Sequence, residues 1–305
     1  MAFPIHFITA TKTYAEINRQ VPAPYIRRTF HLNEEVQSAK LAITGLGFYR
    51  AFFNGKEITK GPLAPYISNP DHIIYYDHYN VTKHLQMGEN VLGLILGNGM
   101  QNSIGGKSWF FNEARWRGAP STALRLTIET KSGKKLLIES DEKFRSKPSP
   151  IIFDDYRYGV YYDARKEIDG WCQPGFDDSD WQSVFKTQTP RGVCKFCTAE
   201  PIVKDRELKP ISIIPYKDGY LYDFGIDTAG LYRLQISGEK GQKIKMAFGE
   251  WYHDGAFDMR NINFTFEHRP EYMKYAQHDH YICKGEQKET YVPSFTYHGF
   301  RYVYI

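Results

Sequence analysis

Apolar and polar residues alternate along much of the chain with the period of two that is typical of β-strands. Leu and Ile at positions 124, 126 and 128 alternate with Arg125 and Thr127, and apolar residues return at 136 and 138 after a Ser-Gly-Lys turn. Similar alternation occurs at 244–248 and 300–304. Asn54 and Gly55 separate two further short segments, and this dipeptide favours the positive φ angles of a type I′ turn. The pattern predicts two β-hairpins and further half-exposed strands in the second half of the chain.

Residues 91–96 form a continuous apolar run between Gly88 and Gly97. Such a run predicts a strand that is covered on both faces, and therefore a central strand of the core. No segment keeps the spacing of an amphipathic helix for more than a turn or two; residues 81–85, behind Asn80 as an N-cap, are the best short candidate. We therefore predict an all-β fold built from β-sandwiches rather than from a parallel α/β sheet.

The length of 305 residues favours about two domains, each large enough to bury an ordinary core. Residues 187–210 contain Pro190, Pro201 and Pro210 but little periodicity, so they are the best linker. We predict two β-sandwich domains in tandem: an N-terminal extension at 1–24, a jelly-roll-like domain at 25–200 and a second sandwich at 201–305.

Composition narrows the class of protein. The net charge of +4 is mild and no block of Lys and Arg occurs, so nucleic acid is not expected as a partner. No apolar run approaches the ~18 residues of a membrane span, and the first seven residues lack the features of a secretory signal. We therefore expect a cytoplasmic protein without a membrane partner. Four unevenly placed cysteines favour reduced thiols over a disulfide scaffold.

Several polar clusters suggest a metal, but each has a simpler structural interpretation. Aspartates at 177, 178 and 180 offer oxygen ligands for calcium, yet such a string more often caps turns around a buried aromatic residue, here Trp181. Cys194 and Cys197 form a lone CxxC without the other two ligands of a structural zinc. His278 and His280 share one face of an extended strand but lack a third ligand. We assign no metal ligand from these patterns.

Acidic residues raise the question of catalysis. Carboxylates at 250, 254 and 258 lie with Arg260 in the polar segment 249–263, and a pair ~6.5–9.5 Å apart could perform inverting glycoside hydrolysis. Solvated acids at a sandwich edge are the simpler interpretation. Asp163 and Arg165 lie two residues apart and favour a structural ion pair. We therefore assign no catalytic residue.

The best candidate for sugar binding is the glycine-rich segment 98–106, which follows the apolar run. Its amides supply planar hydrogen-bonding groups for hydroxyls, and Trp109 and Trp116 supply aromatic faces for the apolar side of a sugar ring. The alternative is that these amides satisfy the backbone of their own loop, which is the more common role of Asn in loops.

Three stretches carry a resemblance to a known family: TYHGFRYV at 296–303, TGLGFYRAFFNGK at 44–56, and YDFG at 222–225 with AG at 229–230. LAP at 63–65, LGNG at 96–99, YDAR at 162–165 and FDDSDW at 176–181 strengthen it. Together they resemble the front part of bacterial α-L-rhamnosidases of glycoside hydrolase family 78. The resemblance implies that a jelly-roll domain and a second sandwich precede an (α/α)6 barrel with the catalytic carboxylates. We expect no such barrel within these 305 residues.

The resemblance also implies sugar contacts. Some family members bind rhamnose in the first domain with a calcium ion, so we assign substrate binding to Asn54, Asn98, Asn102 and Trp109. Met100 stands where relatives often have an aromatic residue. We assign no cofactor, and calcium is the one metal that the resemblance suggests.

The resulting prediction is an accessory region of an α-L-rhamnosidase that acts on terminal α-L-rhamnosyl groups. It would support the catalytic barrel, its missing partner domain, and be inactive alone. One alternative is a stand-alone rhamnose-binding module, with or without calcium. Another is a purely structural role, in which an apolar patch on the second domain docks the barrel or forms a homo-oligomer. An autonomous hydrolase comes last.

Overall fold

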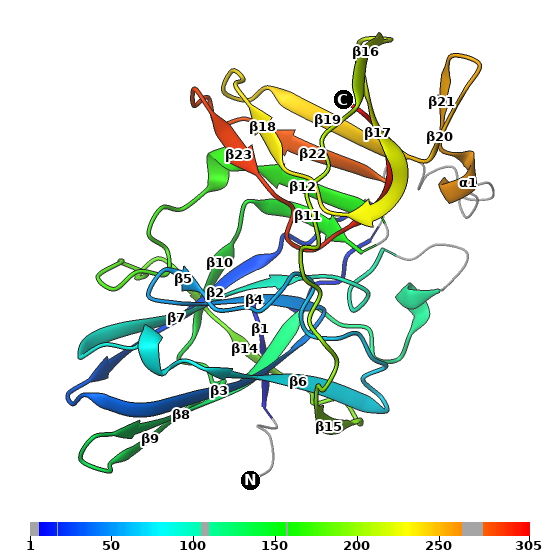
Figure 1. Ribbon diagram of the computed structural model, residues 1–305. Helices are drawn as coiled ribbons and strands as arrows, with labels where there is room; N and C mark the ends of the chain where they lie inside the picture. The colour runs from blue at the N-terminus through cyan, green and yellow to red at the C-terminus, as the bar shows by residue number, and fades with distance from the viewer. Residues whose placement is uncertain (1–5, 17, 105–109, 157, 264–276) are drawn as a thin grey trace.

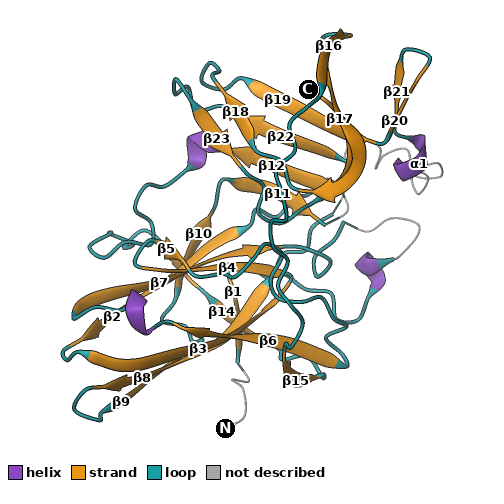
Figure 2. Cartoon of the chain, in the orientation of Figure 1, coloured by secondary structure: helices purple, strands orange, loops and turns teal. Residues whose placement is uncertain are grey.

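The computed structural model describes residues 6–16, 18–104, 110–156, 158–263 and 277–305, and its strands form three large sheets (Figure 1 and Figure 2). The all-β prediction is confirmed. Helical structure in these ranges consists of the single-turn helix α1 (Arg260–Asn263) and three 3-10 turns, η1 (Thr82–His84), η2 (Phe111–Glu113) and η3 (Ala164–Lys166).

The first sheet has seven strands, and β8 and β3 form its longest antiparallel pair. Its order is β14 (Phe185–Thr187), β1 (Phe7–Thr9), β8 (Ser121–Thr130), β3 (Val36–Leu46), β6 (Ile73–Asn80) and β15 (Val193–Phe196), with β9 (Lys135–Glu139) also paired to β8.

The second sheet has six strands and lies against the first. Its order is β13 (Gln182–Ser183), β10 (Arg145–Pro148), β2 (Pro24–Leu32), β7 (Gly88–Gly97), β4 (Phe48–Phe53) and β5 (Lys56–Glu57).

The third sheet has seven strands and contains most of the second half of the chain. Its order is β11 (Ile151–Asp155), β12 (Gly159–Asp163), β22 (His278–Ile282), β19 (Lys243–Gly249), β24 (His298–Tyr304), β17 (Gly219–Gly230) and β16 (Ser212–Tyr216). Two small pairs accompany it: β18 (Leu234–Ile236) with β23 (Glu289–Tyr291), and β20 (Trp251–His253) with β21 (Ala256–Asp258).

Strand β7 of the second sheet is buried on both of its faces. On β7, Leu92, Leu94 and Leu96 belong to the core shared with the first sheet, whereas Ile95 belongs to a core shared with the third sheet. Figure 1 shows the three sheets as successive layers. The prediction that residues 91–96 form a central strand covered on both faces is therefore confirmed, and the second covering layer comes from the second half of the chain.

Two glycines of β7 allow this second layer to approach. A Cβ at Gly97 would lie 2.4 Å from the ring of Phe295, and one at Gly93 would lie 2.7 Å from the Cβ of Cys172. Glycine inside a strand commonly marks such a close approach of another part of the chain. Gly97 therefore allows the segment before β24 to pack directly on the second sheet.

The predicted turns occur where the sequence placed them. Asn54 has φ 49° and Gly55 has φ 82°, as a type I′ turn requires, and β8 and β9 form the second predicted hairpin. The short helix expected at 81–85 is the 3-10 turn η1. Its N-cap is Val81 and not the predicted Asn80, whose side chain instead accepts a hydrogen bond from the Thr82 N–H at 3.1 Å.

The sheets do not divide the chain at a single residue. β11 and β12 precede residue 200 but pair with the third sheet, where β12 lies parallel to β22. Within the expected linker, β15 pairs parallel with β6 of the first sheet. The two sequence halves are therefore joined by strand pairing as well as by the continuous core.

Candidate functional site

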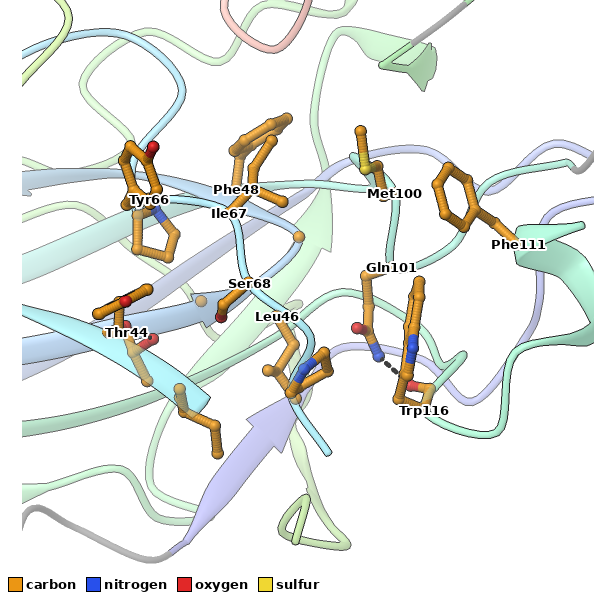
Figure 3. Close-up of a pocket in the computed structure, with 16 residues that line it drawn as sticks. Thr44, Leu46, Phe48, Tyr66, Ile67, Ser68, Met100, Gln101, Phe111 and Trp116 are labelled. Carbon is orange, nitrogen blue, oxygen red and sulfur yellow. Dashed lines mark hydrogen bonds between the residues drawn. The ribbon is translucent and has the colours of Figure 1, made fainter. Parts of the chain in front are cut away.

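A pocket of about 150 Å³ lies beside the loop that follows β7 (Figure 3). Met100, Gln101, Phe111 and Trp116 form one side of it. The other side comes from residues 44–48, where β3 turns into β4, and from the segment 65–70 with two residues of β6. The pocket therefore lies at one end of the first two sheets, next to the glycine-rich segment that the sequence singled out.

The described lining of the pocket combines aromatic rings with a few polar atoms and contains no carboxylate. Its lining offers the rings of Tyr66, Phe111 and Trp116, and none of the lining residues is Asp or Glu. The side chain of Gln101 donates to the backbone oxygen of Trp116 at 2.7 Å, which ties the two together. The Thr44 hydroxyl donates to the backbone oxygen of Tyr75 at 2.6 Å. Aromatic faces with a few polar atoms suit the mixed surface of a sugar.

Asn98 and Asn102 lie behind this wall and are 1% exposed. The Asn98 amide donates to the Val21 oxygen at 3.0 Å and to Asp154 at 2.9 Å, and its oxygen accepts from the Asn102 amide at 2.8 Å. The Asn102 oxygen accepts from the backbone N–H of Ala15 at 2.9 Å. These contacts give both amides a role in holding the loop, which is the alternative that the sequence left open; sugar contact by them stays a prediction.

Asn54 lies at the opposite end of the β4–β7 pair from Asn98. The register places Phe48 opposite Gly97 and Phe53 opposite Leu92, so about 15–20 Å of strand separates the two ends. The Asn54 side chain donates to the His84 oxygen and to Asn90, both at 2.9 Å, and accepts from the Val91 N–H at 2.7 Å. It fixes the hairpin turn. Trp109, the fourth predicted residue, lies outside the described residues.

Two buried carboxylates at the end of β11 hold the loop from behind. Asp154 accepts from the backbone N–H of Asn98 at 2.6 Å and from its side chain at 2.9 Å. Asp155 accepts from the Ile104 N–H at 3.1 Å. Burial raises the pKa of Asp154 to about 7, although the hydrogen bonds from Asn98 oppose this rise. The sequence showed these acids beside the YDAR motif but gave no sign that they contact the loop.

The other acidic candidates form structural contacts. Asp163 binds Arg165 through two hydrogen bonds of 2.8 and 2.9 Å, so the predicted ion pair is confirmed, and the Arg165 guanidinium lowers the pKa of Asp163. Trp181 is buried at 3% exposure, as predicted, and Asp178 pairs with the buried Arg27. In the segment 249–263, Asp258 pairs with Arg260, and the carboxylate at 250 accepts from an Asn amide at 2.6 Å.

The third sheet contains a buried polar pair that the sequence did not reveal. Asp279 lies between His278 and His280 in the sequence and is 0% exposed. Its Oδ2 lies 3.0 Å from Nε2 of His298. Its Oδ1 accepts from the Val160 N–H at 2.9 Å. His280 stacks on Tyr161 with ring centroids 3.9 Å apart, and burial lowers its pKa to about 3.

The described residues contain neither a candidate metal cluster nor a helix long and apolar enough to span a membrane. Within the ranges given above, no group of three or more His, Cys, Asp or Glu side chains could hold a metal ion. All four cysteines are free thiols. None of the described helices has the length and apolar character needed to cross a membrane.

Comparison with known proteins identifies both halves. Residues 34–206 match the family described as the alpha-L-rhamnosidase N-terminal domain, and residues 215–305 match the bacterial alpha-L-rhamnosidase concanavalin-like domain. An alpha-L-rhamnosidase of Formosa agariphila is 34% identical over 93% of this chain, and the match covers 30% of that protein.

Solved structures agree. An alpha-L-rhamnosidase from Dictyoglumus thermophilum superposes with a TM-score of 0.85 at 29% identity, covering 98% of this chain and 33% of that one. The Streptomyces avermitilis alpha-L-rhamnosidase, solved in complex with L-rhamnose, gives 0.81 at 30% identity, covering 93% of this chain and 27% of that one. The chain thus spans about a third of the length of its relatives. It belongs to the bacterial α-L-rhamnosidase family and corresponds to the N-terminal, non-catalytic region of its members.

Proposed function

We propose that this chain is the accessory β-sandwich region of an α-L-rhamnosidase that acts on terminal α-L-rhamnosyl groups, and that it does not hydrolyse glycosides by itself. The observation that carries the proposal is the match of both halves to two rhamnosidase domains, over only about a third of each relative. In the relatives the remaining two thirds would contain the catalytic barrel.

The arrangement of acidic side chains in the described residues supports the proposal that the chain by itself does not hydrolyse glycosides. Inverting glycoside hydrolysis needs an acid and a base on opposite sides of a sugar-sized cleft. The pocket is lined without a carboxylate, and Asp154 and Asp155, which hold its loop from behind, are buried and accept hydrogen bonds from the loop. They are therefore not placed to protonate a glycosidic oxygen or to activate a water.

An apolar patch on the third sheet supports the accessory role. Ile211, Ile213, Tyr220 and Ile226 are 42–71% exposed. The register of β16 with β17 places Ile213 beside Tyr222 and Pro215 beside Tyr220, and a Cβ at Gly225 would lie 3.0 Å from Ile211, so these apolar residues lie along one strand pair. Exposed apolar patches mark interaction surfaces. Four side chains supply only part of the ~800 Å² per partner of a stable dimer, so a covalently linked domain, with its high effective concentration, is the better occupant.

The test is turnover of p-nitrophenyl α-L-rhamnoside by the purified 305-residue chain, with the Streptomyces avermitilis enzyme as the positive control. We expect no release of p-nitrophenol above the uncatalysed rate. Turnover that copurifies with the chain and survives further purification would refute the claim that hydrolysis requires a further domain.

A second candidate function is carbohydrate binding in the pocket. Its supports are the rings of Tyr66, Phe111 and Trp116 around a small cavity, and the position of the cavity beside the loop that the sequence indicated. The described lining residues supply hydroxyls and an amide but no carboxylate, so they do not fit a calcium ion. We therefore propose that a deoxy sugar such as L-rhamnose would bind there without a metal.

Calorimetric titration with L-rhamnose, with and without calcium, tests this second function. We expect binding in both conditions and at least about tenfold weaker binding by Trp116→Ala, because the ring forms one wall of the pocket. Trp251→Ala is the control, since Trp251 is 43% exposed on β20 and does not line the pocket. Absence of heat in the wild type excludes rhamnose binding, and heat only with calcium excludes the metal-free site.

A further inference from the structure

The pocket loop is fixed at both ends by one strand of the third sheet. Asp154 of β11 binds the loop at residue 98 through the backbone and side chain of Asn98, at 2.6 and 2.9 Å. Asp155, the next residue, binds it at residue 104 through the Ile104 N–H at 3.1 Å. Both carboxylates are almost wholly buried, at 2% and 1% exposure. A buried acceptor without its donors is costly, so these contacts define one conformation of the loop.

The residues between these two anchors form the pocket wall. Met100 and Gln101 line the pocket, and the side chain of Asn102 closes the turn by donating to Asn98 at 2.8 Å. Ile104 packs in a small apolar cluster with Phe153 of β11. The wall therefore takes its position from β11 through two carboxylates and one apolar contact, and not from the first two sheets alone.

β11 in turn depends on the second half of the chain. Asp154 pairs with Val160 in the β11–β12 ladder. The Val160 N–H donates to Asp279 of β22 at 2.9 Å, and Asp279 lies 3.0 Å from His298 of β24. A Cβ at Gly159 would lie 2.5 Å from Asp279, so only glycine lets β12 approach this closely. A continuous series of buried contacts thus runs from β24 to the pocket loop.

We propose that Asp154 and Asp155 are positioning residues for the pocket, and that the pocket wall forms only when β11 is paired with β12 in the third sheet. The inference deepens the proposed carbohydrate binding and rests on it for the identity of the ligand. Its consequence is that the N-terminal domain is not a self-sufficient binding module, because its pocket requires β12, β22 and β24. Spatial continuity alone does not demonstrate such coupling, so a remote substitution is the decisive test.

The experiment is amide hydrogen exchange of the full 305-residue chain, followed in peptides that cover residues 98–104. Exchange there is expressed relative to a β8 peptide, so that global unfolding cancels. Asp154→Asn places an amide donor against the Asn98 donors, and Asp279→Asn weakens the support of β12 without touching the loop. We expect about tenfold faster relative exchange in both, which corresponds to the loss of one buried hydrogen bond.

Asp163→Asn is the matched control. Asp163 is also a buried carboxylate of β12, at 3% exposure, but its side chain bonds to Arg165 and not to the loop or to β22. We expect its relative loop exchange to stay within about twofold of wild type. Asp155→Ala is the second variant if Asp154→Asn does not fold, and it should release the Ile104 amide.

Unchanged relative loop exchange in Asp154→Asn and Asp155→Ala would overturn the positioning role. Faster exchange in those two but not in Asp279→Asn would overturn the dependence on the third sheet. A calorimetric titration with L-rhamnose separates this inference from the binding proposal: if the wild type binds no rhamnose, the binding proposal fails while the exchange ratios still decide the positioning. If it binds, Asp279→Asn should weaken binding about tenfold.

Discussion

The contact between Gly97 and Phe295 gives the sharpest test of the shared core. Phe295 is 0% exposed, its ring lies parallel to Phe48 with centroids 6.3 Å apart, and it covers the Gly97 Cα so closely that a Cβ there would lie 2.4 Å from it. Gly97→Ala should therefore be destabilising by ~1–3 kcal/mol through overpacking. Phe295→Ala should cost ~3–5 kcal/mol because it leaves a cavity in the core.

The double variant is the informative one. Removing the Phe295 ring opens the space that the added methyl group at 97 needs, so the overpacking penalty should vanish. We expect the double variant to be about as stable as Phe295→Ala alone, which makes the coupling free energy ~1–3 kcal/mol. A coupling of this size would show that β7 of the second sheet and the segment before β24 pack on each other in solution.

Urea unfolding, followed by far-UV circular dichroism and tryptophan fluorescence, supplies the four free energies, provided that both probes report one transition. Gly93→Ala with Phe295→Ala is the control cycle. Gly93 faces Cys172 and Trp171 instead of Phe295, and it lies four residues, ~13 Å, along the same strand. The control should be additive within ~0.5 kcal/mol. Additivity of the Gly97 cycle within the same limit would refute the packing described for the third sheet.

Three further predictions follow from single contacts. Burial raises the pKa of Asp154 from 3.8 to about 7, so between these pH values the folded chain holds a proton that the unfolded chain has lost. The free energy of unfolding should therefore fall as pH rises from about 4 to 7, by at most ~1.4 kcal/mol per pH unit. Asp154→Asn should flatten this part of a profile of urea midpoint against pH, and parallel profiles for the variant and the wild type would contradict the assignment. Asp178→Ala should lower the free energy of unfolding in urea by ~3 kcal/mol, because it removes the carboxylate that pairs with the fully buried Arg27. Asp180→Ala breaks the exposed pair with Lys147 and should cost under ~1 kcal/mol. Equal costs for the two variants would contradict the burial argument. Asn54→Ala should lower the free energy of unfolding by ~1–3 kcal/mol, because it removes the side-chain hydrogen bonds and strains the φ of 49°. Asn54→Gly should cost less, because glycine loses the same hydrogen bonds but adopts this φ without strain. Thermal unfolding that ranks the two variants the other way would show that the backbone angle does not matter.

The sequence predicted the strands well because their causes are local. Alternation at 124–128, the turn dipeptide at 54–55 and the apolar run at 91–96 each depend on side chains within a few residues of one another. The hairpins, the central strand and the buried Trp181 all follow. The sequence does not predict the placement of β11 and β12 in the third sheet. The parallel pairing of β12 with β22 joins residues more than 100 positions apart and leaves no periodic signal in either segment.

The candidate site shows the same limit. The sequence singled out a loop that lies beside the pocket, and Trp116 lines the pocket, but the assigned amides Asn98 and Asn102 lie behind the wall. An asparagine that binds a ligand and one that closes a loop have the same chemistry, so the sequence cannot tell them apart. The hydrogen-bonding partner distinguishes the two roles, and for Asn98 that partner is Asp154, 56 residues away in the sequence.

Tyr66 and Phe111 line the pocket and were not assigned, since an isolated aromatic residue in a loop has no pattern that distinguishes a ligand-facing ring.

The shared second sheet bears on how a binding site can evolve in such a region. With both faces of β7 covered, its loop at 98–104 cannot move as a free surface loop, because Asn98 is held by β11 and Gly97 lies under Phe295. A rigid wall costs little conformational entropy when a small sugar binds, which favours affinity from few contacts. The same rigidity ties the pocket to β24, the strand next to β17 and its exposed apolar patch.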